Sequence, residues 1–537
     1  MADPLNSRQA PARAGLVLFA LITGALVANI NLSVANIALP DIGRAFDASQ
    51  TQVNLIALGC TLGLAMSVLY LGAIGDRYGR RLLLLLGMGL TIPFSLLCAY
   101  APDANALAAG RILTGVSAGL AYPTTLALIT ALWSAGPKRV AAIALWSGVS
   151  GGGAILGPVI AGALLEQFWW GSVFLIAVPP AAVALAMVAV LVRAHVHEST
   201  ERIDHLSGVM SVLMVALLVL GLGTVTAPGQ LPIALLMLTA SLLLIAGFAW
   251  RQVRVPNPLY DLHLARRRLF WVPAIAGMIV FGSLMGAMFI GQQYLQDVLG
   301  YSTLNAGLAV LPAAIGMMGI APLSGKVVLT RGSKTALLVG YACILPAFLL
   351  MLVGWRAGAH YAVVGLAYLL IGLGAGMALT PASRSLTSSV PVPRVGMASA
   401  TNDLQRDLGG SVMQAVLGSL LTAGYAAAFA KQITDSPEAT TINERTQATL
   451  QQSFTSAADL AEQYPSYADA IMVAAKSSFN VGANWGYAAA VVFVALGALL
   501  VVLVFPGKLA EQRLLADYQE QDLPDQPAPP SGVSGVG

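Results

Sequence analysis

Three ionisable residues stand close together within a long apolar segment of this chain, at positions 403, 406 and 407. On a helix, Asp403 and Asp407 share one face because four positions separate them, and Arg406 lies on nearly the same side. One arginine can neutralise one carboxylate, so the second carboxyl would have no partner on its own helix. In an apolar interior such a group favours its protonated form, and it can then load and release a proton.

We expect Asp407, the deeper of the two, to carry the proton and Asp403 to pair with Arg406. The reverse assignment stays open, as does titration of the two carboxyls as one unit. A purely structural alternative is an internal ion pair that only holds this helix against its neighbours. Charges inside a membrane cost at least about 2.5–3.5 kcal/mol each by insertion scales, so three together favour a function.

The composition indicates that this segment does lie in a membrane. Only 10% of the 537 residues are charged and 57% are hydrophobic, whereas about 25% are charged in an ordinary soluble domain. So few charges could not solvate the surface of a soluble multidomain enzyme, and the net charge of +4 is too small for a nucleic-acid-binding protein. The three cysteines, Cys60, Cys98 and Cys343, all lie in apolar stretches, which argues against disulfides or a cysteine metal site.

Long uncharged stretches recur along the chain, and about 20 apolar residues suffice for one membrane-spanning helix. We predict an all-α integral membrane protein with fourteen such helices, since the apolar runs are continuous and do not alternate as barrel strands do. The first run is too long for a signal peptide and is interpreted as an uncleaved span. The expected ranges are 14–38, 52–74, 82–100, 105–131, 139–163, 169–193, 206–225, 231–250, 269–296, 305–329, 335–354, 359–380, 396–430 and 483–505.

The basic residues predict the orientation. With the N-terminus inside, 21 of the 28 Lys and Arg residues fall in inner segments and 5 in outer ones, while Arg111 and Arg406 stay within spans. This asymmetry follows the positive-inside rule, so we expect both termini in the cytoplasm. The one long outer loop, 431–482, is expected to form one or two short helices, and the tail 519–537 to be disordered.

The chain lacks the motifs of an enzyme or an ATPase. No GxxxxGK[ST] phosphate loop occurs, and Gly372, Gly374 and Gly376 lie within an apolar helix with no preceding strand. We interpret His195, His197 and His205 as part of a solvated loop, because no carboxylate or cysteine cluster completes a metal site. The sequence therefore predicts a gradient-driven transporter without catalytic residues, cofactor or metal.

A short basic loop follows the second span. Its glycine lets another helix approach, its aspartate can face the positive N-terminus of a neighbouring helix, and its arginines can hold the two halves together at the inner face. A merely basic inner loop is the alternative. The residues are Gly72, Asp76, Arg77, Gly79, Arg80 and Arg81.

This loop resembles the GxxxDRxGRR signature of the major facilitator superfamily. The fourth span is similar to the family's intramembrane arginine motif, with Arg111 in place and Thr114 where glutamine is usual. The fifth span resembles the GxxxGPxxG antiporter motif, although tight helix packing alone could explain its glycines. The residues of that motif are Gly153, Gly157, Pro158 and Gly162.

The segments 294–302 and 402–410 resemble the fourteen-helix drug:proton antiporters of EmrB/QacA type, and the likeness covers residues 14–505. It implies two six-helix bundles, 14–193 and 269–505, with two inserted helices at 206–250. Residues 325–334 echo the 72–81 loop in the second bundle, as an internal repeat would. One departure stands out, because Asn31 occupies the position of the family's first-span aspartate, which is a proton or cation site.

The resemblance implies a secondary transporter of the inner (plasma) membrane that exports amphipathic small molecules in exchange for protons, as a monomer in the bilayer. Export of a lipid, siderophore or metabolite by the same fold, with or without proton coupling, is the alternative, and a non-transporting membrane sensor is the least favoured. Proton coupling is assigned to Asp403, Asp407, Arg406 and Arg111. Polar candidates for the substrate cavity are Asn31, Asn36, Tyr122, Gln292, Gln293, Tyr294 and Gln296.

Overall fold

The computed structural model describes residue 11 and residues 13–48, 50–192, 203–225, 230–436 and 442–522. Every regular element in these ranges is a helix, and fourteen spans among them are long and apolar enough to cross a membrane. The predicted all-α membrane protein with fourteen spans is therefore confirmed.

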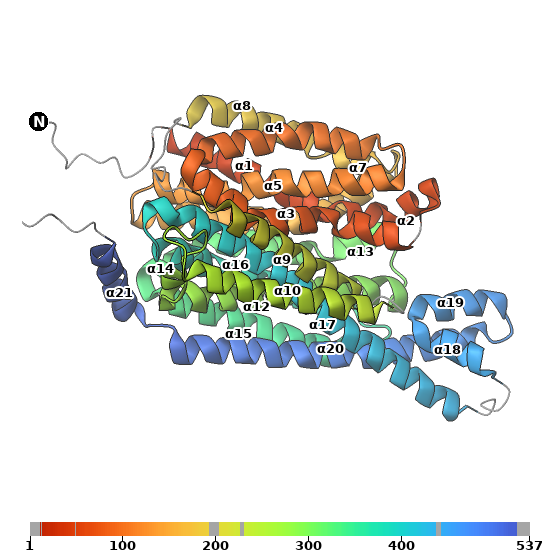
Figure 1. Cartoon of the computed structure of the whole chain (residues 1–537). Coiled ribbons are helices and arrows are strands. Elements are labelled where there is room, and N and C mark those ends of the chain that lie inside the picture. Colours follow the sequence, from red (N-terminus) through yellow and green to blue (C-terminus); the bar gives the residue numbers. More distant parts are fainter. Residues whose placement is uncertain are drawn as a thin grey trace, which may run out of the picture.

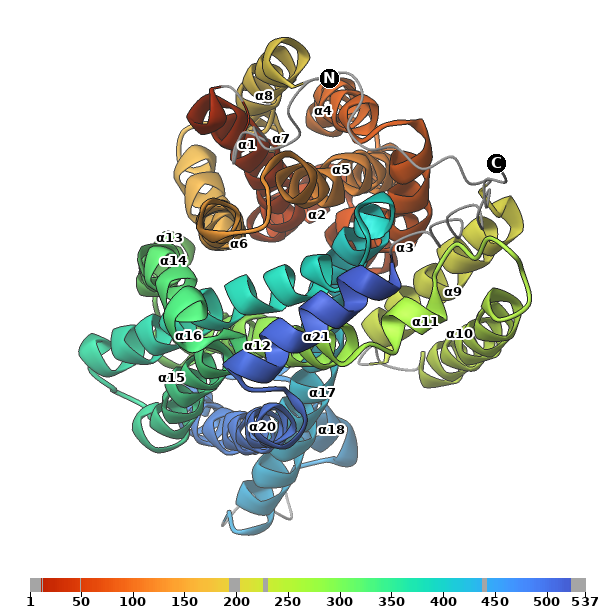
Figure 2. The same cartoon turned by 90° about the vertical axis from the view of Figure 1, so that its left-hand side faces the viewer.

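A first group of helices forms one bundle. Helix α5 packs against α3 and α4, while α1 packs against α6 and α8 (Figure 2). Small residues let these helices approach closely, as is usual where no water drives their association. The elements are α1 (Ala14–Ser33), α2 (Ala35–Phe46), α3 (Gln50–Tyr78), α4 (Arg80–Ala99), α5 (Ala104–Leu132), α6 (Pro137–Leu165), α7 (Ser172–Leu175) and α8 (Val178–Leu191).

A second group forms another bundle around a core that is rich in aromatic side chains. Tyr341, Tyr368 and Phe348 have almost no exposed surface, and Trp355 packs between Tyr294 and Tyr487. The elements are α12 (Arg268–Gln293), the π-helical turn η1 (Tyr294–Val298), α13 (Thr303–Ala309), α14 (Leu311–Arg331), α15 (Ser333–Gly354), α16 (Tyr361–Ser388), η2 (Val392–Arg394), α17 (Val395–Thr434) and α20 (Ala468–Val504).

Two further spans, α9 (His205–Thr224) and α10 (Leu231–Gln252), lie beside the bundles. Helix α9 packs on α3 and α17, and α10 packs on α9 (Figure 2). Leu236 and Leu243 of α10 are 70% exposed, as expected for side chains that face lipid. The short helix α11 (Leu262–Ala265) leads into the second bundle.

The two ends of the molecule differ. Helices α18 (Glu444–Gln452) and α19 (Phe454–Gln463) lie at one end, which confirms the short helices expected in the 431–482 loop. Helix α21 (Lys508–Gln521) lies at the other end, where α1 also begins (Figure 1). We refer to these as the α18 end and the α21 end.

Several boundaries differ from the predicted ones. The first span is interrupted at Val34 and continues as α2, and the last span begins at Ala468, well before position 483. Lys476, expected in the outer loop, therefore lies on α20. The spacing of charges missed this because a helix can project beyond the apolar layer and carry charges there.

Two other expectations concern the C-terminal tail and the histidines of the segment 194–205. Residues 519–521, expected as the start of a disordered tail, form the last turn of α21. The rest of that tail from 523 onward lies outside the described residues, as do His195 and His197. His205 is described, and its Nδ1 lies 2.7 Å from the Tyr70 hydroxyl.

Candidate functional site

Helix α17 carries the ionisable cluster between the two bundles. It packs on α12 and α20 of its own bundle and on α3 and α5 of the other. Asp403 and Arg406 are 1% and 2% exposed, whereas Asp407 is half-buried. Because an α-helix has about 3.6 residues per turn and α17 begins at Val395, the two carboxyls lie about two and three turns inside α17.

The predicted ion pair between Asp403 and Arg406 is wrong in this structure. Within the described ranges, no salt bridge involves either carboxyl of the cluster. The Asn402 side-chain amide donates a hydrogen bond of 3.2 Å to Asp403 Oδ1. One oxygen of each carboxyl, Oδ2 of Asp403 and Oδ2 of Asp407, is buried with no hydrogen-bond partner in the described part of the chain. Neither acid therefore forms an ion pair in the part of the chain that the structure describes.

Arg406 instead extends to the other bundle. Its Nη1 donates a hydrogen bond to the Tyr122 hydroxyl. Its Cζ lies 5.8 Å from the ring centre of Tyr122, 5.5 Å from that of Trp146 and 5.5 Å from that of Phe281. These distances are within the range of cation–π attraction, so the rings explain why the guanidinium turns away from its helix neighbours.

The sequence predicted Tyr122 as a site residue but did not predict Trp146 or Phe281. Both are apolar aromatic residues within predicted spans, where most such residues fill the core. The sequence held no signal that separated these two from the others, because their role depends on where Arg406 points.

Arg111 of α5 is fully buried and fixes three helices of the first bundle. Its Nη1 donates 2.7 Å to the main-chain carbonyl of Asn31 on α1, and its Nε donates 3.3 Å to that of Ile56 on α3. Its Nη2 and the Asn31 side-chain nitrogen are buried without a hydrogen-bond partner among the described residues. Asn31 thus contacts Arg111 through its backbone and brings no charge to it.

The structure does not gather the other predicted cavity residues around Tyr122. Tyr294 is buried in the second bundle, where its hydroxyl donates 2.7 Å to the Arg356 carbonyl and its ring stacks on Trp355. Gln292 and Gln293 donate to nearby main-chain carbonyls of Ala306 and Phe289. Gln296 lies in η1 and Asn36 in α2, and the side chain of Asn36 is outside the described set.

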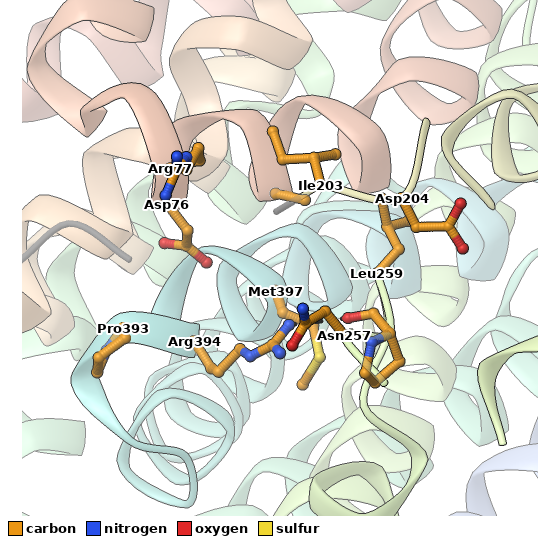
Figure 3. A pocket seen from close by; sticks show the side chains of 11 residues that line it. Asp76, Arg77, Ile203, Asp204, Asn257, Leu259, Pro393, Arg394 and Met397 are labelled. Atoms are coloured by element: carbon orange, nitrogen blue, oxygen red, sulfur yellow. Dashed lines mark hydrogen bonds between the residues drawn. The ribbon is translucent and has the colours of Figure 1, made fainter. Parts of the chain in front are cut away.

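Asp76, at the α21 end, faces the N-terminus of α17 as the sequence predicts. Its Oδ1 accepts a hydrogen bond of 3.0 Å from Gly396 N and one of 2.7 Å from Arg80 Nη2. Arg80 Nη2 also donates 2.7 Å to the Val392 carbonyl of the second bundle. The Asp76 carboxyl points toward the turn that carries Met397 (Figure 3). We call these contacts between Asp76, Arg80, Val392 and Gly396 the α3–α17 junction.

Two glycines permit this junction. A Cβ at Gly72 would lie 3.0 Å from the Ala400 Cβ and 3.1 Å from the Gly396 carbonyl oxygen. The basic loop expected after the second span is a single residue in the structure, because α3 runs to Tyr78 and α4 begins at Arg80. That residue, Gly79, has a φ of 112°, which other residues rarely adopt. Arg81 stays within the first bundle and donates 2.7 Å to the Ala189 carbonyl. Arg77 and Asp76 line a cavity of about 30 Å³ beside Asn257 (Figure 3).

The predicted antiporter motif lies on α6, and its glycines face neighbouring helices. Cβ atoms at Gly153 and Gly157 would collide with Leu26 and Ser33 of α1, and Gly162 faces Leu304 of α13. Pro158 lies inside the helix. This part of the motif therefore lets α1 pack tightly on α6.

Known proteins resemble this chain over most of its length. The multidrug efflux pump LfrA of Mycolicibacterium smegmatis is 32% identical over 424 residues, which are 78% of this chain and 83% of LfrA. The multidrug resistance protein Stp of Mycobacterium tuberculosis is 29% identical over 77% of this chain and 76% of its own length.

The structure of the human organic anion transporter TETRAN covers 91% of this chain and 100% of its own, with a TM-score of 0.57 and 16% identity. At that identity the likeness concerns the fold alone. Residues 21–413 match the sequence profile of the Major Facilitator Superfamily. Together with the relatives, this match indicates a multi-pass membrane transporter with small-molecule substrates. The chain belongs to the Major Facilitator Superfamily.

Proposed function

We propose that this protein exports amphipathic small molecules across the plasma membrane in exchange for protons. The names of its relatives LfrA and Stp, a multidrug efflux pump and a multidrug resistance protein, support the direction and the cargo class. The protein works as a monomer without cofactors, with both termini in the cytoplasm. The bundles 14–193 and 269–505 move against each other, and the helices of 206–250 stay beside them.

The surroundings of the Asp403 and Asp407 carboxyls are the observation that supports proton coupling. Both belong to a helix that contacts both bundles, and each has a buried oxygen without a hydrogen-bond partner in the described chain. A charged carboxylate in such surroundings is costly, and protonation removes the cost. Binding and release of a proton at this pair would therefore change how α17 packs against the first bundle.

The α3–α17 junction supplies the element that must open. Arg80 and Asp76 are 1% and 7% exposed by side chain, and their contacts join the first bundle to the start of α17. They close the α21 end in this conformation. Opening that end breaks the junction, so the free energy of its contacts sets part of the balance between the two states.

Proton release on addition of cargo tests this proposal. Everted vesicles that contain the protein receive ethidium, and a pH-sensitive dye reports proton movement across the membrane. We expect the double variant Asp403→Asn with Asp407→Asn to insert normally but to lose proton release and efflux, while each single variant separates the roles of the two acids. Asp469→Asn, at an exposed acid in the first turn of α20, is the matched control and should behave as wild type.

Normal coupled transport in the double variant would refute the assignment of the proton site. Efflux that survives a protonophore in wild type would refute proton coupling altogether and leave the export function standing.

A further inference from the structure

Three aromatic rings surround the Arg406 guanidinium at the contact between the bundles. Tyr122 and Trp146 come from α5 and α6 of the first bundle, and Phe281 comes from α12 of the second. Each ring centre lies within 5.8 Å of Arg406 Cζ. We call the three rings the aromatic box.

The box is held in place by its own contacts. The Tyr122 and Trp146 rings stack, with centres 5.5 Å apart and planes at 25°. Trp146 Nε1 donates 2.9 Å to the Thr125 hydroxyl, which fixes the indole. A site whose rings are already positioned loses little entropy when a ligand binds, so the box is preorganised.

Arg406 occupies the box without the partners that a structural arginine normally has. Within the described ranges no carboxylate lies in salt-bridge range of it, and its Nε and Nη2 are buried without an acceptor. The Tyr122 hydroxyl accepts a hydrogen bond from it and the three rings lie within cation–π range, while its charge also acts on Asp403 and Asp407 from beyond ion-pair distance. Aromatic faces arranged in this way recognise organic cations in general, since the negative face of each ring attracts positive charge.

We propose that the aromatic box of Tyr122, Trp146 and Phe281 is a cargo site for planar organic cations, and that Arg406 is its tethered occupant. Cargo and the guanidinium compete for the same three rings. The inference rests on the proposed export function and names the chemical class of one cargo. Because the rings come from both bundles, movement of the bundles assembles and separates the box, and cargo can enter once α17 withdraws Arg406.

The competition makes a specific prediction about Arg406. Loss of an ordinary structural arginine weakens ligand binding or leaves it unchanged, whereas loss of a competing occupant strengthens the binding of a cation. One cation–π contact changes affinity by about two- to thirty-fold, depending on how far the site excludes water.

The test measures binding to the purified full-length protein, so it needs no gradient. Proflavine, a planar cation at neutral pH, and acridine, its largely neutral counterpart, are titrated by fluorescence. We expect Arg406→Gln to bind proflavine about ten-fold more tightly than wild type and Phe281→Leu about five-fold more weakly. Acridine should change little in either variant.

Matched variants separate the box from general effects. Arg139→Gln also removes a partly buried cation, but that guanidinium donates a hydrogen bond of 3.3 Å to the Ser388 hydroxyl, so proflavine affinity should change by no more than about two-fold. Phe289→Leu alters a phenylalanine on the same helix as Phe281 and should have no effect. Tyr122→Leu should weaken proflavine binding while Tyr122→Phe restores it, which shows that the ring is needed and that the fold tolerates change there.

Equal proflavine affinity in wild type and Arg406→Gln, or equal losses in Phe281→Leu and Phe289→Leu, would overturn the inference. Absence of proflavine binding to wild type would overturn it as well. In each case the vesicle assay decides independently whether the protein exports and whether protons drive it, so failure of the box is distinguishable from failure of the proposed function.

Discussion

The segments 72–81 and 325–334 occupy equivalent places in the two bundles, each at the junction of two helices. Gly79 and Gly332 both join two helices with positive φ, at 112° and 91°. Gly72 faces α17 of the second bundle, and Gly325 faces α6 of the first, where a Cβ would lie 3.1 Å from the Ala144 Cβ. Backbone and helix approach are thus repeated, as in an internally duplicated fold.

The ion pair between Asp76 and Arg80 is not repeated, although Lys334 stands at the position equivalent to Arg81. Leu329 and Ser333 occupy the positions equivalent to Asp76 and Arg80. At the segment 325–334 the carboxylate is that of Glu511 on α21. It accepts hydrogen bonds of 3.0 Å from Ser333 N and 2.7 Å from Arg384 Nη1. These contacts join α21 to its own bundle, whereas those of Asp76 join the two bundles.

This difference indicates which contact between the bundles must break. Along α6 and α14 the bundles meet through small and flexible apolar residues, since Gly148, Gly151 and Gly152 face Ala321, Met317 and Met318. Such a surface can slide or rock without leaving a charge unpaired. The α3–α17 junction cannot, so we expect it to act as the switch at the α21 end and α6–α14 as the pivot.

The largest effect is expected from Asp76→Asn. It keeps the shape of the side chain but leaves Arg80, 1% exposed by side chain, without a counter-charge. Breaking a buried pair in this way costs about 3–5 kcal/mol, so efflux should fall at least ten-fold and the α21 end should open. Efflux assays and distance measurements between spin labels across that end would detect it. Asp41→Asn, in the exposed pair with Arg44, should cost under about 1 kcal/mol; equal effects of the two variants would contradict the comparison.

Glu511→Gln should detach α21 and leave transport nearly intact. The glutamate is 3% exposed, and its charge-assisted hydrogen bonds to Arg384 and Ser333 are each worth about 1.5–3 kcal/mol. Limited proteolysis should therefore cut between α20 and α21 faster than in wild type. Glu520→Gln, at an exposed residue of the same helix, is the control. If Glu511→Gln lost as much efflux as Asp76→Asn, the contacts of the segment 325–334 would also hold the two bundles together.

Alanine substitutions at Gly72 and Gly325 compare how tightly the two segments pack against the opposite bundle. At Gly72 the new Cβ meets both a Cβ and a backbone carbonyl oxygen of α17 within 3.1 Å, whereas at Gly325 its second neighbour is 3.8 Å away. We expect Gly72→Ala to cost about 1–3 kcal/mol in closing the α21 end, and Gly325→Ala less. Cross-linking between cysteines placed across that end would measure closure. Gly89→Ala, which meets nothing within 4 Å, should match wild type, and a larger defect from Gly325→Ala than from Gly72→Ala would reverse the assignment of switch and pivot.

The smallest effect is expected from Asp204, which joins α9 to α10 through Arg251 at 2.9 Å. Burial alone would raise the pKa of Asp204, but hydrogen bonds from Arg251 and Ser207 outweigh it and lower the pKa to about 2. The unfolded value is about 3.9, so the stabilisation is present above about pH 4 and is lost as the pH falls through about 2. Between about pH 5 and 8 the pH profile of efflux should be the same in Asp204→Asn as in wild type. An altered profile would bring the helices beside the bundles into the coupling mechanism.

Much of the fold could be predicted because the apolar layer excludes charge. The fourteen spans follow from the uncharged stretches. Asp76 was predicted to face a helix N-terminus and does so at Gly396, although it lies in the last turn of α3 and not after it. The ends of α17 and α20 could not be predicted in the same way, since both helices continue past the apolar stretch into polar sequence.

The amino-acid sequence by itself determined which helices cross the membrane and which of them carry ionisable groups, because burying a charge in an apolar layer has a high cost wherever the helix packs. Only the tertiary structure decided what those groups contact. Arg406 could pair with its neighbours on α17 or reach the rings of the other bundle, and Glu511 meets Ser333 although 178 positions separate them. Such choices depend on the packing of distant helices, and local periodicity carries no information about that packing.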